Sequence, residues 1–435
     1  MSEVAWAAGG GADPRCVIVR PVPRAHALLL ENVHTTAAEV LGGYDVEVQR
    51  LGSALAEDEL ISTLNGLPGD GPVMVGLRSK THVTPKVLDS VPRLMVVGAF
   101  CIGTDQIALD VARRGGVAVF NAPFSSTRSV AELVIAEVVM LSRQICDRSK
   151  AAHEGRWAKS ATGAHEVRGK TLGIVGYGHI GSQVSILAEA LGMKVLFFDI
   201  DKKLPLGNAN GVDSLEELLR SSDFISLHVP DTELTRGMIG APELTVMRKG
   251  SFLLNLSRGK VVNIPALQAA LVGGRLAGAA VDVYPREPAN TTLPFESELR
   301  GLDNVILTPH IGGSTQEAQA SIGREVATAV GRYFEQGSTQ GCVTLPSLDL
   351  PSPRPAGTAS RIVNVHQNVP GVLSAINRVV AESGVNIVGQ ALATVDEVGL
   401  LFIDVPLTAQ DERAGALCQA ISELETSVRT RLLGL

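Results

Sequence analysis

The sequence predicts an α/β chain with two doubly wound parallel sheets and a smaller C-terminal domain of the order βαββαβ. Three observations support this. Short apolar, β-branched runs alternate with helical patterns along most of the chain. A glycine-rich turn, GYGHIG, lies between such a run and a helical pattern. A proline-rich stretch, residues 346–360, reads as an extended linker before residues 361–435.

Composition limits the classes of function. A chain of 435 residues, 45% of them apolar, can form two to four domains. Its net charge of −7 argues against a nucleic-acid-binding surface. The five cysteines are scattered without a C-x-x-C pair, which predicts reduced thiols in the cytoplasm and neither a disulfide framework nor a metal site.

We expect no membrane partner. No uninterrupted apolar run reaches about 18 residues, and the most apolar helical pattern, Val130 to Leu141, is broken by Glu132 and Glu137. The N-terminus lacks the basic segment of a signal peptide, and residues 1–14 are expected to form a flexible tail.

Residues 15–125 are expected to form the first α/β domain. Its strand-like runs are CVIVR (16–20), YDVEVQRL (44–51), VMVGLR (73–78), RLMVVGA (93–99) and VAVFNAP (117–123). Their alternation with helical patterns indicates a parallel sheet covered by helices on both faces.

The glycine turn indicates a dinucleotide-binding fold of the Rossmann type. The run TLGIV (171–175) precedes it, so this run is the first strand of a second domain. Gly176 permits the tight turn, Gly178 lets the backbone approach a pyrophosphate, and Gly181 allows close helix packing. The following helix offers unpaired N–H groups to the pyrophosphate. A glycine turn that binds nothing is the alternative, and the strand and helix around the turn argue against it.

Asp199 follows the next strand, 18 positions after Gly181. A carboxylate there accepts hydrogen bonds from the adenosine ribose and repels a 2′-phosphate, which favours NAD over NADP. Lys202 and Lys203 nearby weaken that preference.

Three charged residues stand where later strands of this domain are predicted to end. Arg258 lies in NLSRG, Glu287 in VDVYPREP and His310 in LTPHIGG. A histidine suits the base that takes a hydroxyl proton during hydride transfer. A carboxylate can orient that imidazole, and an arginine can bind a substrate carboxylate. The alternatives are a loop histidine without catalytic function and a structural Arg258–Glu287 ion pair.

These motifs resemble the D-isomer-specific 2-hydroxyacid dehydrogenases. The strings LRSKTH, GAFCIGTDQIAL, NAPFSSTRSVAELVI, RGKTLGIVGYGHIGSQ and LTPHIGGSTQEAQ are similar to the short, ACT-containing D-3-phosphoglycerate dehydrogenases. The resemblance implies a Rossmann-type NAD-binding domain, residues 126–312, inserted in a flavodoxin-like substrate domain, residues 15–125 and 313–345. It assigns substrate binding and polarisation to Arg258, support of the histidine to Glu287, and acid/base catalysis to His310.

The resemblance also assigns contacts with the cofactor NAD. Besides the glycines and Asp199, the implied residues are His179, Ile180, His228, Val229, Pro230, Ser257, Asp282 and Gly313. For His228, Val229 and Pro230, an ordinary strand end is the alternative.

Arg78, Ser79 and Lys80 follow a predicted strand and are expected to face the interdomain cleft as a substrate loop. Arginine and lysine suit phosphate and carboxylate groups. Lys80 stands where close relatives carry arginine, and an exposed basic turn is the alternative. Asn121 is a second substrate candidate. Trp157 and Lys159 could be interface, neighbouring-subunit or surface residues.

Residues 361–435 resemble an ACT domain, a small-molecule sensor. In the family, L-serine binds between paired ACT domains and inhibits the enzyme. By resemblance His366, Asn368 and Asn386 match the serine contacts, while Val369 replaces an arginine of close relatives. An ACT domain that only dimerises is the alternative.

The resemblance implies NAD-dependent oxidation of 3-phosphoglycerate to 3-phosphohydroxypyruvate by a cytoplasmic homotetramer, with 2-oxoglutarate reduction as a possible side activity. Two alternatives remain: a dehydrogenase of another D-2-hydroxy acid, and an NAD-responsive, non-enzymatic interaction protein.

Overall fold

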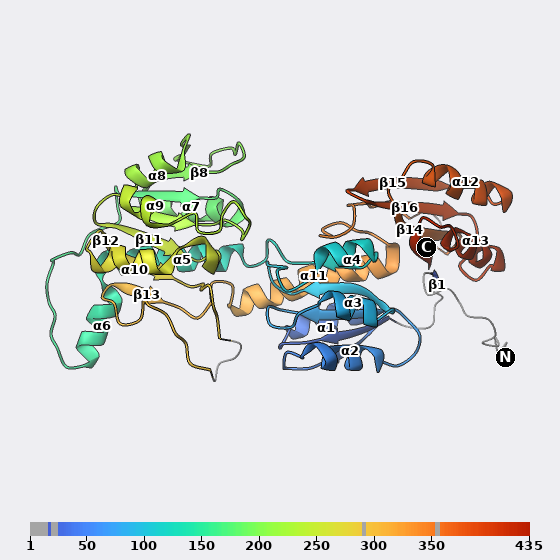
Figure 1. The fold of residues 1–435 in the computed structure, drawn as a ribbon, viewed down its shortest axis with the longest axis horizontal. Helices are drawn as coiled ribbons and strands as arrows, with labels where there is room; N and C mark the ends of the chain where they lie inside the picture. Colours follow the sequence, from blue (N-terminus) through green and yellow to red (C-terminus); the bar gives the residue numbers. More distant parts are fainter. Residues whose placement is uncertain (1–15, 19–24, 289–292, 353–356) are drawn as a thin grey trace. The chain divides into compact units, whose positions relative to one another are not determined.

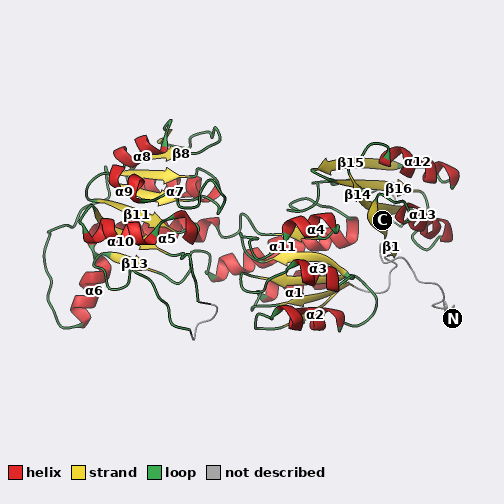
Figure 2. Ribbon diagram, viewed as in Figure 1, coloured by secondary structure: helices red, strands yellow, loops and turns green. Residues whose placement is uncertain are grey.

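A computed structural model describes residues 16–18, 25–288, 293–352 and 357–435. The predicted tail, 1–14, and part of the predicted linker lie outside the described residues. Contacts divide the chain into two compact units: a first unit, up to Pro123 and from Ala320 to Leu435, and a second unit, Phe124–Gln319. The ribbon in Figure 1 follows the chain through both, and Figure 2 distinguishes their helices and strands.

The first unit contains an N-terminal sheet of five parallel strands in the order β3-β2-β4-β5-β6. This 2-1-3-4-5 order is the flavodoxin-like arrangement that we predicted. The strands are β2 (Ala25–Leu29), β3 (Val46–Arg50), β4 (Val73–Leu77), β5 (Leu94–Ala99) and β6 (Ala118–Phe120). The helices are α1 (Thr35–Gly42), α2 (Glu57–Asn65), α3 (Pro85–Ser90), α4 (Leu109–Arg114) and α11 (Gln316–Gln336).

The two faces of this sheet are covered by different helices. Residues of α1 and α11, such as Leu41 and Val330, share one apolar cluster with the sheet. Residues of α2 and α3, such as Leu60 and Val87, share another cluster on the opposite face. Burial on both faces explains why β4 and β5 read as continuous apolar runs.

One predicted strand is placed wrongly. We expected CVIVR to begin the N-terminal sheet, but β1 (Cys16–Ile18) pairs in parallel with β17 of the C-terminal sheet. The N-terminal sheet begins instead with β2, whose segment AHALL is buried along four of its five residues. A short β-rich run can pair with any open sheet edge, so its composition did not identify its partner.

The second unit contains a seven-stranded parallel sheet in the order β13-β12-β11-β10-β7-β8-β9. The order 3-2-1-4-5-6 within it confirms the Rossmann-type prediction. The strands are β7 (Thr171–Val175), β8 (Lys194–Phe198), β9 (Ala209–Gly211), β10 (Phe224–Leu227), β11 (Ser251–Asn255), β12 (Leu276–Val281) and β13 (Val305–Leu307). The helices are α5 (Thr127–Arg143), α6 (Ile145–His153), α7 (His179–Ala190), α8 (Leu215–Ser221), α9 (Ala241–Val246), α10 (Ile264–Val272) and the 3₁₀ turn η1 (Gly259–Val261).

The C-terminal domain has the predicted order βαββαβ. Its elements are β14 (Ser360–Gln367), α12 (Val372–Glu382), β15 (Gly389–Val395), β16 (Val398–Val405), α13 (Glu412–Ser422) and β17 (Ser427–Gly434). They form an antiparallel sheet in the order β17-β14-β16-β15, with β1 added beside β17. Both helices share an apolar cluster with one face of this sheet.

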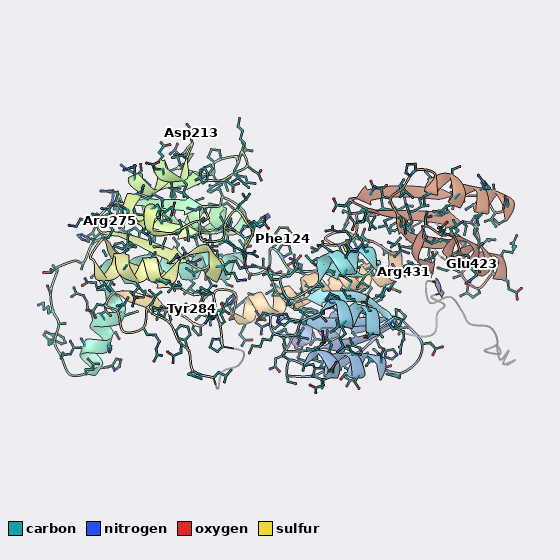
Figure 3. All side chains as sticks on the ribbon, viewed as in Figure 1. Phe124, Asp213, Arg275, Tyr284, Glu423 and Arg431 are labelled. Atoms are coloured by element: carbon teal, nitrogen blue, oxygen red, sulfur yellow. The ribbon has the colours of Figure 1, made fainter. Side chains whose placement is uncertain are left out.

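The other face of the C-terminal sheet packs against the rest of the first unit. Val363 and Phe402 belong to the same apolar cluster as α11. Arg431, labelled in Figure 3, is buried with its guanidinium 4.0 Å from the ring centroid of Tyr333. Arg361 forms a buried ion pair with Asp404 at 2.7 Å. In the described part of the chain, no helix is long and apolar enough to cross a membrane.

Candidate functional site

Three neighbouring strands of the second unit bring the predicted catalytic residues to one edge of the sheet. Arg258 follows β11, Glu287 follows β12, and His310 follows β13. Because these adjacent strands are parallel, their carboxyl ends lie together, where doubly wound sheets bind ligands.

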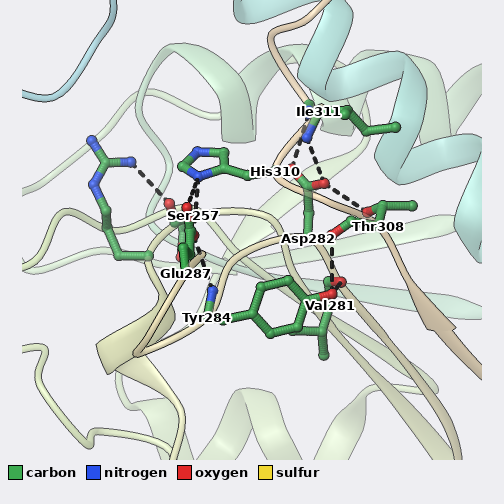
Figure 4. A network of polar contacts seen from close by, with 10 residues as sticks. Ser257, Val281, Asp282, Tyr284, Glu287, Thr308, His310 and Ile311 are labelled. Atoms are coloured by element: carbon green, nitrogen blue, oxygen red, sulfur yellow. Dashed lines mark hydrogen bonds and ion pairs between the residues drawn. The ribbon is translucent and has the colours of Figure 1, made fainter. Parts of the chain in front are cut away.

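His310 and Glu287 form a hydrogen-bonded pair (Figure 4). The His310 Nδ1 atom lies 2.9 Å from Glu287 Oε2 and 3.0 Å from Oε1. This hydrogen bond and the negative charge of Glu287 raise the pKa of His310 despite partial burial. Burial opposes the charged form of Glu287, but the hydrogen bond with His310 and the charges of His310 and Arg258 outweigh it, so the pKa of Glu287 is lowered.

The backbone holds this histidine in an uncommon conformation. His310 has a φ of 55°, in the left-handed region that few non-glycine residues adopt. Asp282 stabilises the segment around it, because its buried carboxylate accepts hydrogen bonds from the backbone N–H groups of Ile311 and Gly312 at 2.8 and 2.9 Å. The Thr308 hydroxyl donates to the same carboxylate at 2.6 Å. Asp282, which we expected to contact the cofactor, therefore holds the segment that carries His310.

Arg258 is half-buried beside the pair. Its Nη1 donates to the carbonyl of Ser257 at 2.9 Å, and its own carbonyl accepts from the Asn255 side chain at 3.0 Å. The Ser257 hydroxyl donates to Asn255 Oδ1 at 2.8 Å. Asn255, the last residue of β11, thus fixes the turn that carries Arg258.

The three glycines of the predicted pyrophosphate turn differ in the space around them. Gly176 has a φ of 90°, and a Cβ there would lie 2.4 Å from the carbonyl oxygen of His228. A Cβ on Gly181 would lie 2.2 Å from the Gly176 oxygen, so this glycine is needed for helix packing. A Cβ on Gly178 would meet no described atom within 4 Å, so this position is open to an incoming group. No side chain caps α7, whose first turn includes His179 and Ile180.

Asp199 lies at the end of β8, as predicted, and braces the glycine turn. Its Oδ2 accepts from the backbone N–H of Tyr177 at 2.8 Å, and its Oδ1 accepts from that of Asp201 at 2.9 Å. Lys203 Nζ lies 3.9 Å from Oδ1. The predicted ribose-binding carboxylate is therefore hydrogen-bonded to the backbone of the predicted pyrophosphate loop.

The remaining cofactor candidates lie around the same edge. His228, Val229 and Pro230 follow β10, and burial lowers the pKa of His228 to about 3, which keeps its ring neutral. Its Nε2 lies 2.8 Å from the Ser226 hydroxyl. Gly313 lies two residues beyond Ile311 in the segment after His310.

The predicted substrate loop lies in the first unit and is held by Glu31, a residue that the sequence analysis missed. The Glu31 carboxylate accepts hydrogen bonds from the backbone N–H groups of Ser79, Lys80 and Thr81 at 3.0, 3.1 and 2.7 Å. The side chains of Ser79 and Lys80 are exposed, and Arg78 is half-buried. The missed signal was a charged residue two positions after the end of β2, a strand that we had not recognised.

Asn121 and Trp157 differ in their surroundings. Asn121 follows β6, and its Nδ2 donates to the Ile102 carbonyl at 2.7 Å. Trp157, beyond α6, is 87% exposed, and Lys159 is also exposed.

The predicted effector residues lie at one end of the C-terminal sheet. Asn364, a neighbour that we did not single out, donates from Nδ2 to the hydroxyls of Ser427 and Thr430, each at 2.9 Å. Its Oδ1 therefore accepts from His366 Nδ1 at 3.0 Å, which leaves His366 Nε2 without a proton. Burial lowers the pKa of His366 and favours this neutral form.

Asn368 donates from Nδ2 to the carbonyl of Asp396 at 3.0 Å. Asn386 follows α12 in the loop before β15. Among the residues that the structure describes, no group of three or more His, Cys, Asp or Glu side chains could hold a metal ion.

Known families match two parts of the chain. Residues 135–312 match the NAD-binding domain of the D-isomer-specific 2-hydroxyacid dehydrogenases. Residues 362–429 match the AHAS small subunit-like ACT domain.

Similar proteins cover almost the whole chain. A D-3-phosphoglycerate dehydrogenase of Dictyostelium discoideum is 47% identical over 414 residues, which are 95% of this chain and 98% of that protein. One from Escherichia coli strain K12 is 48% identical over 93% of this chain and 97% of that protein.

Solved structures agree in fold. The D-lactate dehydrogenase of Aquifex aeolicus, complexed with NAD and lactic acid, is 29% identical, with a TM-score of 0.64 over 74% of this chain and 100% of that chain. A glyoxylate reductase from Paecilomyes thermophila is 28% identical, with a TM-score of 0.66 over 74% of this chain and 99% of that chain. The chain belongs to the D-isomer-specific 2-hydroxyacid dehydrogenase family, in its D-3-phosphoglycerate dehydrogenase branch.

Proposed function

We propose that this chain oxidises D-3-phosphoglycerate to 3-phosphohydroxypyruvate, the first step of phosphorylated L-serine biosynthesis. The observation that carries the proposal is the likeness to D-3-phosphoglycerate dehydrogenases over 95% of the chain. The chain is an NAD-dependent oxidoreductase, because its second unit matches the NAD-binding domain of the family.

His310 is the base in this reaction. Its Nδ1 is held by Glu287, so its Nε2 is the nitrogen that takes the substrate hydroxyl proton. The carbon–oxygen bond becomes a carbonyl as the hydrogen on C2 departs with its electron pair. Arg258 binds the substrate carboxylate and polarises the C2 oxygen. Glu287 stabilises the imidazolium that forms.

The residues of the second unit fit a dinucleotide. Gly176, Gly178 and the uncapped start of α7 would hold the pyrophosphate, and Asp199 would accept from the ribose. When bound, NAD supplies the hydride acceptor. Asp199 favours NAD over NADP because its carboxylate repels a 2′-phosphate.

Arg78 and Lys80 supply the positive charge for the substrate phosphate. Lys80 offers a point charge where arginine would offer paired hydrogen bonds, so affinity depends more on Arg78.

L-Serine binds at His366, Asn368 and Asn386 and inhibits a cytoplasmic homotetramer. The ACT match supports an amino-acid effector.

One assay tests the proposal. Purified protein with NAD and 3-phosphoglycerate is followed for NADH formation, with and without L-serine. We expect NADH formation that serine suppresses. No NADH from 3-phosphoglycerate would contradict the proposed substrate, whereas activity indifferent to serine would contradict only the regulation.

The similar solved structures suggest an alternative function, oxidation of a different D-2-hydroxy acid. They include the D-lactate dehydrogenase structure. Initial rates with D-lactate in parallel, and with 2-oxoglutarate and NADH, separate the substrates. His310→Ala tests the non-enzymatic alternative: if the variant kept full cellular function, the chemistry would not be its role.

A further inference from the structure

A groove of about 560 Å³ lies in the first unit, along the exposed side of α11 and the segment Ser338–Gly341 that follows it. Its lining residues belong to none of the sites assigned above. The groove is bounded by a fixed turn, because Gly337 has a φ of 78° and the Thr339 hydroxyl donates to the Pro346 carbonyl at 2.6 Å. Contacts within the chain therefore hold this wall of the groove in place without a ligand.

Positive charge dominates the lining. Arg324, Thr328 and Arg332 recur every four residues, so they share one side of α11. Arg324 is exposed and has no hydrogen bond or ion pair with any described residue. Arg332 Nη2 lies 3.4 Å from Asp349 Oδ2. Glu325 is the single acidic residue among the lining residues.

Ser338 supplies a second, independent observation. It is 2% exposed and lines the groove, yet its Oγ has no hydrogen-bond partner among the described residues. A buried hydroxyl without a partner destabilises the folded state, so such groups normally have a neighbour, a water or a ligand as hydrogen-bond partner. A ligand oxygen in the groove would provide the missing partner.

The spacing of the charges defines the ligand. Arg332 lies eight positions after Arg324 in the helix, which is about 12 Å along the axis. A single carboxylate reaches one of them, whereas an anion with several acidic oxygens can reach both. We propose that this groove binds a multiply charged oxyanion, a phosphate ester or a polycarboxylate, between Arg324 and Arg332, with Ser338 donating to it.

The test titrates the full-length protein with pyrophosphate and, separately, with citrate by isothermal calorimetry. NAD is present at saturation, and the protein carries both Arg78→Ala and Arg258→Ala, so that the cofactor site and the proposed substrate site do not report binding. In this background, we expect Arg324→Ala to weaken binding at least tenfold and Ser338→Ala to weaken it several-fold. Arg220→Ala is the matched control, because Arg220 is an exposed helical arginine paired with Glu216.

The result distinguishes the two sources of oxyanion. Stronger binding of pyrophosphate identifies phosphate esters, and stronger binding of citrate identifies polycarboxylates. Arg324→Ala alone, with Arg78 and Arg258 intact, is expected to keep the wild-type oxidation rate and thermal midpoint, which shows that the loss of binding is local. No binding of either probe, or binding unchanged by both groove variants, would overturn the proposal.

Discussion

Glu31 Oε1 accepts a hydrogen bond of 2.7 Å from the backbone N–H of Thr81. Together with the N–H groups of Ser79 and Lys80, this gives one carboxylate three backbone donors. Glu31 is itself buried and has a φ of 57°. Glu31 therefore holds the predicted substrate loop through the loop's backbone, and the loop's side chains take no part in these hydrogen bonds.

Replacing Glu31 by Gln is expected to raise the KM for 3-phosphoglycerate about tenfold with a smaller change in kcat. The amide loses the charge-assisted hydrogen bonds, each of which contributes about 1.5–3 kcal/mol. Steady-state kinetics measures the change, with Glu39→Gln on the exposed side of α1 as control. An unchanged KM would show that the loop is fixed by other contacts.

Replacing Glu287 by Gln is expected to shift the acid limb of kcat/KM for oxidation to lower pH. Oxidation needs neutral His310, and Glu287 raises the pKa of that imidazole. Loss of the carboxylate lowers this pKa, so the base becomes available at lower pH, while the plateau falls about 100-fold because the imidazolium is less stabilised. Rate profiles from pH 5 to 9 measure both effects. If the acid limb of the kcat/KM profile did not move, a group other than His310 would determine its pKa.

Glu137, on α5, is expected to destabilise the fold as pH rises. Its side chain is buried, neither oxygen has a hydrogen-bond partner among the described residues, and burial with the nearby charge of Asp282 raises its pKa from 4.5 to about 8. Between these values the folded state holds a proton that the unfolded state has released, so stability falls with increasing pH.

Glu137→Gln removes this dependence. Chemical denaturation is expected to show equal free energies of unfolding near pH 5 and a variant that is about 3 kcal/mol more stable at pH 8. Equal stabilities at both pH values would mean that the carboxyl is ionised or solvated in the folded state.

Gly178 and Gly181 of the predicted dinucleotide loop are expected to respond differently to alanine. Gly178→Ala meets no described atom and has an extended backbone conformation, so it keeps stability but loses NAD affinity at least tenfold. Gly181→Ala drives a Cβ against the Gly176 oxygen and lowers the free energy of unfolding by about 2 kcal/mol as well. Calorimetric NAD titration and thermal unfolding of both variants test this. Equal stability losses would contradict the assigned difference.

Asn364→Leu is expected to weaken serine inhibition at least tenfold without changing the rate in the absence of serine. The Asn364 amide orients His366 through Nδ1, and leucine leaves that ring without its acceptor. Inhibition curves for L-serine measure the effect, with Asn377→Leu at a half-buried position of α12 as the comparison. Unchanged inhibition would remove Asn364 from the effector site.

The sequence predicted the features that depend on local chemistry. Gly176, Gly178 and Gly181 were identifiable because a dinucleotide turn requires small residues at fixed spacing. Arg258 and His310 were identifiable because parallel strands bring their carboxyl ends together. The orientation of Asp282 was not predictable, because its hydrogen bonds go to Ile311 and Gly312, far along the chain.

Long-range pairing also explains the other omissions. Glu31 lies 48 positions before Ser79, and no spacing rule links a residue after one strand to a loop after another. β1 was assigned to the wrong sheet because its three residues carry β propensity without specifying an edge. β9 is also three residues long, and its sequence, ANG, has no apolar or β-branched run that would predict a strand.

The pairing of β1 with β17 has a consequence for self-association. β1, an edge strand of three residues, leaves only a short open edge on that side of the C-terminal sheet. β15, the edge strand on the opposite side, has seven residues. If two copies joined through β15, each would pair its long open edge with that of the other. Such a pair would be a closed twofold dimer with no long edge left for growth into a fibre.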